Sequence, residues 1–325
     1  MNVAIIGCGL IGRKRAHALC GCRLVACVDT VEARAAALAA TVQEATAGTD
    51  WQKVVQRPDI DILVVATTHD MLAEITSAAV LAGKHVLVEK PAARRAQELT
   101  PIIEAAERMN VCVRVGFNHR YHPSLLRARQ LVAEGVAGPL LYVRGRYGHG
   151  GRPGYEKEWR ARPEVSGGGE LIDQGVHLID LARLFLGDFA EIHGVIHTYY
   201  WKMPVEDNGF LLLRTARGQV AFLHASCTEW KNLFSFEVFG RDAKIEVSGL
   251  GGSYGTERLT LYRMLPEMGP PETTAWEYPM ADRSWEHEFG EFLEDIRLQR
   301  APAAGLRDAQ AALKVVETVY GASRS

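Results

Sequence analysis

VAIIGCGLIG, residues 3–12, is the stretch that decides the fold of this chain. A short apolar run of strand length is followed at once by G-x-G-x-x-G, and residues 13–19 can continue as a helix. In this setting the three glycines permit, in order, a tight turn, close approach of a pyrophosphate to the backbone, and packing of the helix on the strand. The free N–H groups at the start of the helix favour phosphate. The predicted dinucleotide contacts in this stretch are Gly7, Gly9, Leu10, Ile11 and Gly12.

A second apolar run, residues 24–28, ends at Asp29. This is the spacing expected for the acid that hydrogen-bonds the adenosine ribose of a dinucleotide. A carboxylate at this place would repel the 2′-phosphate of NADP. The sequence therefore predicts NAD as the cofactor, with NADP less favoured, although Arg13 is a nearby cation that could weaken the preference.

Composition bounds the class of protein. The chain has 325 residues, of which 47% are hydrophobic and 23% charged, and its formal net charge is −2. These values are typical of a soluble globular protein with two domains, and they give no bulk attraction to nucleic acid or anionic membrane. No run approaches the roughly 18 apolar residues of a membrane span. We expect no signal peptide, because Met1-Asn2 leads directly into the first predicted strand. The six cysteines form no C-x-x-C pair. We therefore expect a cytoplasmic protein with reduced thiols and no metal site.

Residues 1 to about 118 alternate between predicted strands and helices. This alternation predicts a doubly wound parallel sheet whose ligands bind at the carboxyl ends of the strands. Four residues lie at such ends and should face one crevice, namely Gly7, Asp29, Thr67 and Lys90. The predicted strands are 3–6, 24–28, 61–66, 85–88 and 111–116, and the predicted helices between them are 31–40, 51–56, 72–82 and 94–109.

Beyond Phe117 the pattern changes to short strand-like runs separated by tight turns, which predicts an α+β domain with a large, mainly antiparallel sheet. Its outer face is a candidate oligomer interface. The expected division is an NAD-binding Rossmann domain over residues 1–119 and a substrate-binding and oligomerisation domain over 120–325. The predicted strands are 140–147, 192–200, 209–215, 219–226, 232–239, 244–248 and one near 258–264 in an otherwise loop-like 249–271, and the predicted helices are 123–135, 170–186, 284–299 and 306–320.

The strand at residues 85–88 ends abruptly in Glu89-Lys90-Pro91. Proline confines the residue before it to extended backbone, so covalent geometry aims Lys90 more than packing does. Such rigidity suits a catalytic lysine. A surface Glu–Lys pair that closes a strand is the alternative, and the surrounding motifs favour the catalytic interpretation.

A second chemical cluster is predicted in SGGGELIDQGVHLID, residues 166–180. Asp173 and His177 are four residues apart, so they share a face of a helix. Gly175 within that helix costs about 1 kcal/mol relative to alanine, which close approach of a ligand or another backbone would explain. Histidine suits proton transfer near neutral pH, and a neighbouring carboxylate can orient it. A solvated Asp–His pair is the alternative, but a nicotinamide enzyme needs a group that takes the hydroxyl proton, and His177 is the best candidate.

Together, the glycine-rich start, Asp29, Glu89-Lys90-Pro91 and G-G-G-x-x-x-D-x-G-x-H resemble the Gfo/Idh/MocA family of nicotinamide-dependent oxidoreductases. Members act mostly on sugars, inositols and sugar nucleotides. The resemblance spans nearly the whole chain. It implies a Rossmann domain followed by a domain with an open, mainly antiparallel sheet, and a homodimer or homotetramer formed through that sheet.

Carried over by position, the resemblance also implies roles for individual residues. Lys90 would bind and polarise the reacting hydroxyl or carbonyl and contact the cofactor. Asp173 would hold the substrate, and His177 would be the general acid/base. Glu89 would lie near the nicotinamide ribose. These roles make Lys90, Asp173 and His177 the predicted catalytic and substrate-binding residues.

The chain departs from the family after its third strand, where the family often has Thr-Pro-Asn and this chain has Thr67-Thr68-His69. Thr67 and His69 are still expected to contact the cofactor, but the nicotinamide-side contacts of this turn stay open. The family's arginine after the last Rossmann strand corresponds to Arg120, which is expected to contact substrate or cofactor.

Cationic side chains gather between residues 144 and 162, immediately before the predicted catalytic helix. We expect Arg152, Trp159 and Arg160 to line the substrate mouth. Arginine binds phosphate or carboxylate bidentately, and tryptophan stacks on a sugar or base. A sugar nucleotide or sugar acid is therefore a plausible substrate, while a neutral sugar, an inositol or a merely solvated basic loop stays open.

The sequence thus predicts an NAD-dependent oxidoreductase that transfers hydride between a secondary alcohol of a sugar-type substrate and nicotinamide. Two alternatives remain. One is an NAD-dependent glycosidase that uses transient oxidation and elimination, and the other is a non-catalytic regulator that senses sugar or NAD. The intact set of Lys90, Asp173 and His177 argues against the regulator.

Overall fold

The computed structural model describes residues 1–267 and 269–323. Contacts within the chain divide it into two compact units. The first comprises Met1–Phe117, Glu164–Gly167 and Trp285–Leu313, and the second comprises Asn118–Pro163, Gly168–Ser284 and the chain from Lys314. The sequence predicted one boundary at residue 119. In the structure, the first unit also contains two segments from later in the chain, Glu164–Gly167 and Trp285–Leu313.

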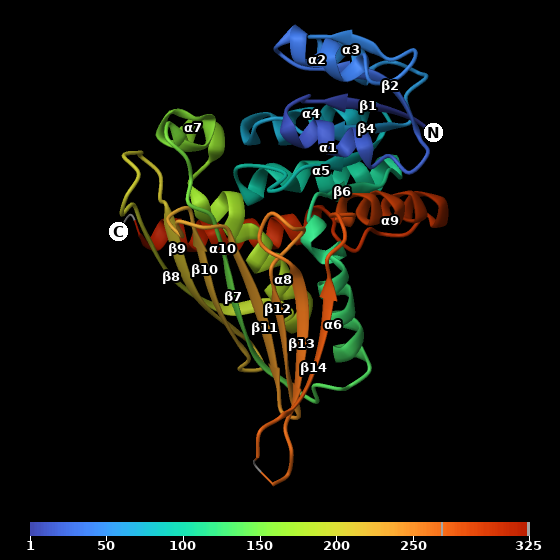
Figure 1. Ribbon diagram of the computed structural model, residues 1–325. Helices are drawn as coiled ribbons and strands as arrows, with labels where there is room; N and C mark the ends of the chain where they lie inside the picture. Colours follow the sequence, from blue (N-terminus) through green and yellow to red (C-terminus); the bar gives the residue numbers. More distant parts are fainter. Residues whose placement is uncertain (268, 324–325) are drawn as a thin grey trace. The chain divides into compact units, whose positions relative to one another are not determined.

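A six-stranded parallel sheet forms the first unit, in the order β3-β2-β1-β4-β5-β6 (Figure 1). Winding reverses between β1 and β4, and in such sheets ligands bind outside the carboxyl ends of the strands at this point. The central strands are continuous apolar runs because helices cover both faces. The elements are β1 Asn2–Ile6, α1 Leu10–His17, β2 Arg23–Val28, α2 Glu32–Ala39, β3 Thr46–Gly48, α3 Trp51–Val55, β4 Ile62–Val65, α4 His69–Leu81, β5 His85–Val88, α5 Ala96–Met109, β6 Val113–Val115 and α9 Ser284–Leu298, of which Ser284 falls in the second unit.

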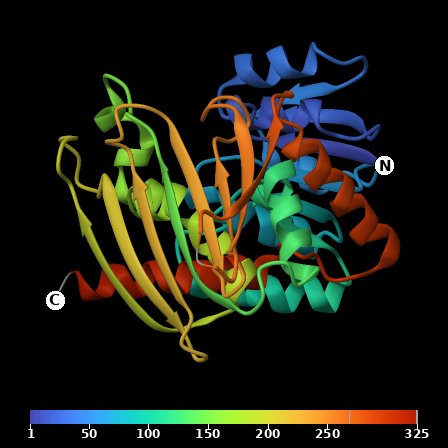
Figure 2. The same cartoon turned by 60° about the horizontal axis from the view of Figure 1, so that its bottom comes forward.

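An eight-stranded sheet forms the second unit, in the order β14-β13-β12-β11-β7-β10-β9-β8. Every neighbouring pair is antiparallel except β10 with β7. Figure 2 shows the strands side by side with the yellow-green α8 against one face. The strands are β7 Leu140–Gly148, β8 Phe189–His197, β9 Asn208–Thr215, β10 Val220–Ser226, β11 Leu233–Gly240, β12 Ala243–Ser248, β13 Glu257–Arg263 and β14 Glu272–Tyr278.

Helical segments of the second unit carry the residues of interest. The short turns are η1 Asn118–Tyr121, η2 Tyr155–Lys157 and η3 Trp159–Ala161, and the longer helices are α6 Pro123–Ala133 and α8 Val176–Leu186. The π-helical turn η4 Leu171–Gly175 leads directly into α8, so the single helix predicted over 170–186 is a π turn followed by an α-helix. α7 Pro163–Ser166 and α10 Leu306–Ala322 each run from one unit into the other.

Several other local predictions were wrong, and the strand predicted over 192–200 is β8 at Phe189–His197. The strands β3 and β14 were not expected, because both lie at sheet edges and neither has an alternating apolar pattern. The helix α4 begins at His69 and not at Leu72, since Thr68 takes the N-cap position with extended backbone and the polar residues after it form the first turn.

Within the described residues, no helix is both long enough and apolar enough to cross a membrane.

Candidate functional site

The glycine-rich turn of the first unit has the geometry that a pyrophosphate needs. Gly7 has φ +95°, and a Cβ there would collide with the backbone of Ala66. A Cβ on Gly12 would collide with the carbonyl of Gly7, so only glycine lets α1 lie this close to the turn. At Gly9 a Cβ would meet nothing within 4 Å, and no side chain caps the helix that follows. The open side of the turn and the start of α1, which no side chain caps, therefore fit a dinucleotide.

Asp29 is fixed at the end of β2 by backbone amides. Its Oδ2 accepts from the N–H of Cys8 at 2.8 Å, and its Oδ1 accepts from the N–H of Val31 at 2.8 Å. Arg34 lies at the edge of contact, with Nη1 4.0 Å from Oδ1. The carboxylate thus lies beside the glycine-rich turn, where it could accept hydrogen bonds from the two hydroxyls of a ribose.

The turn after β4 follows the same edge of the sheet. Thr67 lies against the glycine turn, since its backbone nitrogen is among the atoms nearest to a Cβ built on Gly7. His69 is buried, and its Nδ1 is 2.8 Å from the carbonyl oxygen of Ser166. Cofactor contacts by these two residues stay predictions.

Lys90 follows β5 at the same edge, and the Lys90–Pro91 peptide bond is cis. The residue before it is held firmly. The Glu89 N–H donates to the carbonyl of Val65 at 2.9 Å, and the Glu89 carboxylate accepts from Nε of Arg15 at 2.7 Å. Arg15 is fully buried and also pairs with Glu288 at 2.5 Å. The predicted closeness of Glu89 to a nicotinamide ribose stays a prediction, and its observed partner is this arginine.

In the second unit, Asp173 and His177 are both 4% exposed. Asp173 lies in the π turn η4 and His177 is the second residue of α8. The carboxylate of Asp173 accepts from Nε of Arg160 at 2.8 Å. Gly175 is explained by packing, because a Cβ there would lie 2.7 Å from Leu171 and 3.4 Å from Ala225 of β10.

The His177 ring touches a second histidine that the sequence analysis did not select. The ring centroids of His119 and His177 are 3.8 Å apart and the rings are nearly perpendicular, at 88°. His119 lies in η1 and is also buried. Tyr147 of β7 contacts both rings edge-on, and Phe234 of β11 lies parallel to His119. The region around His177 is therefore an aromatic cluster built from four elements.

Arg120, expected to contact substrate or cofactor, has a different observed partner. Its Nε donates to Asp180 Oδ2 at 2.7 Å and its Nη2 donates to Oδ1 at 2.5 Å. Both side chains are buried. This bidentate pair fastens η1 to α8, and contact of Arg120 with a ligand stays a prediction.

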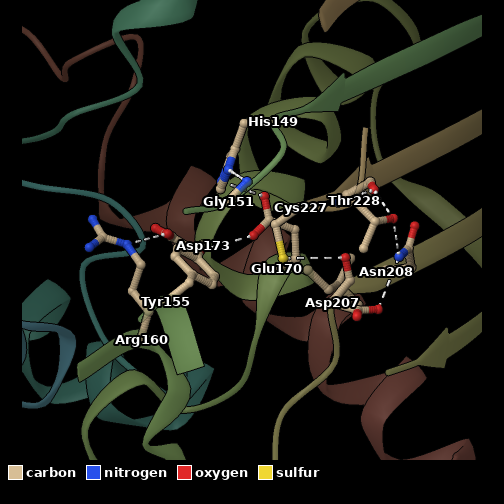
Figure 3. Close-up of polar contacts among 12 residues, drawn as sticks. His149, Gly151, Tyr155, Arg160, Glu170, Asp173, Asp207, Asn208, Cys227 and Thr228 are labelled. Atoms are coloured by element: carbon tan, nitrogen blue, oxygen red, sulfur yellow. Dashed lines mark hydrogen bonds and ion pairs between the residues drawn. The ribbon is translucent and has the colours of Figure 1, made fainter. Parts of the chain in front are cut away.

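Figure 3 shows a further buried acid, Glu170, close to Asp173. His149 Nε2 lies 3.5 Å from Glu170 Oε1, and the Tyr155 hydroxyl lies 3.5 Å from Oε2. His149 Nδ1 accepts from the N–H of Gly151 at 2.9 Å. Burial lowers the pKa of His149 in spite of the nearby Asp173 carboxylate, so we expect a neutral ring whose Nε2–H faces Glu170. The cluster offers hydrogen-bond donors and acceptors of the kind that bind sugar hydroxyls.

The cationic segment before η4 is largely neutralised by neighbouring acids. Arg152 Nη2 lies 2.7 Å from Glu158, and Arg160 pairs with Asp173 and, at 3.7 Å, with the same glutamate. The Arg160 guanidinium also lies 4.6 Å from the centre of the Trp159 ring. Arg160 is thereby brought to Asp173, while contact of Arg152 and Trp159 with a substrate stays a prediction.

Two family models match consecutive parts of this chain. Residues 1–117 match the model described as an oxidoreductase family with an NAD-binding Rossmann fold, and residues 125–246 match the GFO/IDH/MocA C-terminal domain. The chain belongs to the Gfo/Idh/MocA family. This confirms the resemblance, the fold class and the NAD-binding Rossmann domain predicted from the sequence.

Among curated members of the family, inositol 2-dehydrogenase 2 of Saccharopolyspora erythraea is 30% identical over 261 residues, which cover 78% of this chain and 72% of that protein. Levoglucosan dehydrogenase of Pseudarthrobacter phenanthrenivorans is 34% identical over 171 residues, and this match covers 52% of the present chain but only 44% of the relative. A solved levoglucosan dehydrogenase in complex with NADH and levoglucosan shares the fold, with a TM-score of 0.89 at 23% identity over 100% of this chain and 97% of that one.

Three residues that the structure places in or behind the predicted sites were missed by the sequence analysis. His119 was passed over beside Arg120, although a histidine directly after the last Rossmann strand was a usable signal. Glu170 stood within the G-G-G motif and was treated as a spacer. Arg15 gave no signal, because nothing in the local pattern says that one arginine of a basic helix is buried.

Proposed function

We propose that this member of the Gfo/Idh/MocA family is an NAD-dependent dehydrogenase or reductase of a secondary alcohol in a sugar-type substrate. Family membership, together with the burial of Asp173 and His177 on one helical segment, carries the proposal. The relatives named above are dehydrogenases of a sugar and of inositol. NAD supplies the hydride acceptor when bound, so the chain's own residues must handle the hydroxyl proton.

Each proposed catalytic residue has one task. His177 takes the hydroxyl proton at an imidazole nitrogen and returns it in the reverse reaction. Lys90 donates a hydrogen bond to the reacting oxygen and lowers its affinity for the proton. Asp173, oriented by Arg160, accepts a hydrogen bond from a substrate hydroxyl and stabilises the imidazolium. The proposal requires that all three side chains reach one substrate.

We further propose a neutral, polyhydroxylated substrate. Arg152 and Arg160 were the residues expected to bind an anion, and their nearest partners are Glu158 and Asp173. An anionic substrate would have to compete with these carboxylates. The acid Glu170, with His149 and Tyr155 beside it, instead supplies hydrogen-bonding groups suited to hydroxyls.

For assembly, we propose a homodimer or homotetramer formed through the face of the eight-stranded sheet opposite α8. Leu212 and Phe222 are directly paired across β9 and β10, and they are 50% and 48% exposed. Val195 and Tyr142 continue the same face and are also exposed. Large apolar side chains gathered on one sheet face favour burial by a second copy.

We also propose a cytoplasmic location. The six cysteines all lie in the described part of the chain, and none of them forms a disulfide bond. Unbridged thiols are typical of reducing compartments.

Two variants that keep side-chain size test the catalytic assignment, namely Lys90→Met and His177→Asn. Each should lower kcat about 10²- to 10⁴-fold, because each removes a group that acts on the reacting oxygen or its proton. The affinity for NAD, measured by calorimetry, should change by only a few-fold. Lys53→Met is the matched control, since Lys53 is an exposed lysine of α3. Near-normal turnover by either catalytic variant, with NAD binding intact, would refute the assignment.

A further inference from the structure

The contact between His119 and His177 places two buried, titratable rings against each other within the second unit. Their centroids are 3.8 Å apart, which is close for any aromatic pair, and both side chains are 4% exposed. An imidazole of ordinary pKa changes charge near neutral pH. At this separation the charge on one ring must affect the other, because burial leaves little water to screen it.

The fold holds this contact rigidly. Arg120, the next residue after His119, binds Asp180 through two hydrogen bonds of 2.7 and 2.5 Å. Asp180 lies one turn beyond His177 on α8. The arginine–aspartate pair therefore fixes η1 against the same helix that carries His177, and His119 cannot move away without breaking a buried ion pair.

The groups around the pair determine how easily it takes up a proton. Within the second unit, Tyr147 contacts both rings and has a pKa raised well above its usual value by burial, and Tyr254 beside it is raised as well. Both phenols are therefore neutral. Arg120 pairs with Asp180 and Arg160 pairs with Asp173. A third imidazole, that of His122, stacks on His119 with ring centroids 5.8 Å apart, and its Nδ1 lies 3.0 Å from Glu257. Phe234 closes the far side of His119 with an apolar ring.

We propose that His119 is a positioning residue for His177. It orients the His177 ring, and in the working pH range the two rings together carry at most one positive charge. The second proton is disfavoured because two imidazolium ions would then touch in a buried cluster. Competition by His119 keeps His177 available as a neutral base at a lower pH than an isolated histidine would allow. The inference rests on the proposed function only for its link to catalysis, since the proton sharing is a property of the rings themselves.

The direct test is nuclear magnetic resonance of the full chain labelled at the histidine Cε1 atoms. The chain has 11 histidines, and the signals of the pair are assigned by their loss in His119→Phe and His177→Asn. In the wild-type protein, the two signals should titrate together, with curves broader than a single-site titration. In His119→Phe, the His177 signal should follow one simple step, with its midpoint higher by about half a pH unit or more.

Phe234→Leu is the matched control. It loosens the packing around His119 but leaves both imidazoles in place, so the coupled titration should persist. Independent single-site curves in the wild type, or an unchanged His177 midpoint in His119→Phe, would overturn the inference. The wild-type curves decide the question even where a variant does not fold.

Kinetics separate this inference from the proposed function. If His177 is the base, the acid limb of kcat/KM for alcohol oxidation should move upward in His119→Phe, while the high-pH plateau stays within a few-fold of the wild type. His119→Ala should lower that plateau, because it removes the ring that orients His177. A shift seen by magnetic resonance with no shift in the rate profile would refute the role of His177 in catalysis and leave the coupled pair established.

Discussion

Asp29 is the residue that we propose sets the preference for NAD over NADP. Two backbone amides hold its oxygens at 2.8 Å, so the negative charge is fixed at the edge of the NAD-binding crevice. A 2′-phosphate brought to this place would meet a like charge in a partly desolvated site. The exposed Arg34 lies 4.0 Å away and offsets this repulsion only weakly.

Asp29→Asn should weaken NAD binding by roughly tenfold, because one charge-assisted acceptor for the ribose is lost. The same change should strengthen NADP binding, since the repulsion is gone and Arg34 is released from its neighbour. Calorimetric titration with both nucleotides measures the two effects. Asp29→Asn combined with Arg34→Ala is the control and should lose the gain toward NADP. An unchanged ratio of the two affinities in Asp29→Asn would show that Asp29 does not distinguish the 2′-hydroxyl of NAD from the 2′-phosphate of NADP.

For single residues, the sequence allows candidate site residues to be selected where they belong to a local motif. The glycines, Asp29 and Lys90 were selected as candidates because strand ends and turns have characteristic spacings. His119 and Arg15 were not, because their importance lies in a contact with a residue far along the chain. For Arg15 these partners are Glu89 and Glu288, 74 and 273 positions away. Spacing alone carries no information about such pairs.

The three glycines before η4 show why the element that carries Asp173 starts where it does. The carboxylate of Glu206 accepts from the N–H groups of Gly169 and Leu171 at 3.0 and 3.1 Å, and from the Tyr320 hydroxyl at 2.7 Å. A Cβ on Gly168 would collide with that hydroxyl, and one on Gly169 would collide with the backbone of Glu206. The glycines therefore permit a buried anchor that fixes the start of the π turn.

Gly168→Ala should destabilise the protein by about 2 kcal/mol, because the new methyl group displaces Tyr320 and breaks its hydrogen bond to a buried carboxylate. Urea denaturation measures the free energy of unfolding. Gly321→Ala is the matched control, since a Cβ there meets nothing within 4 Å and alanine favours a helix. Tyr320→Phe combined with Gly168→Ala should cost less than the sum of the single changes. Strict additivity would argue against the anchor.

Elements with a strong apolar period could be predicted, and those without it could not. The strand His85–Val88 appears with the predicted bounds, because its continuous apolar run is typical of a buried parallel strand. Glu272–Tyr278 was missed, since it is an edge strand with mostly exposed residues and gains its hydrogen bonds from β13 alone. The π turn was also missed, because the spacing from Asp173 to His177 fits an ordinary helix equally well.

On the scale of the whole molecule, the exposed face of the eight-stranded sheet determines the proposed assembly. Leu212→Glu combined with Phe222→Glu should give a monomer, because two carboxylates would be buried without partners in the interface. Light scattering coupled to size exclusion measures the mass. Lys53→Glu is the control, since this exposed lysine lies on α3 of the first unit and not on the sheet. A wild-type mass equal to that of one chain would contradict the proposed oligomer.

The two-unit organisation was only partly readable from the sequence. Near Phe117 the sequence pattern changes from strands alternating with helices, typical of a parallel sheet, to short strands joined by tight turns, typical of an antiparallel sheet. This change marks where the first sheet ends. Nothing in residues 284–298 indicated that this helix packs with the first unit, where Glu288 meets Arg15 and Asp295 meets Arg114 in buried ion pairs. Pairing across such distances depends on the folded structure and not on local pattern.

We propose that this chain oxidises a secondary alcohol of a neutral, sugar-type substrate with NAD. The most direct measurement is the absorbance of reduced nicotinamide after purified protein is mixed with NAD and, separately, with neutral hexoses and anhydrosugars, inositols, uronic acids and sugar nucleotides. We expect reduction with a member of the neutral classes and its loss in His177→Asn. Turnover confined to uronic acids or sugar nucleotides would contradict the neutral substrate. No reduction with any class, no oxidation of NADH by the matching ketones and confirmed NAD binding would together contradict the proposed dehydrogenase.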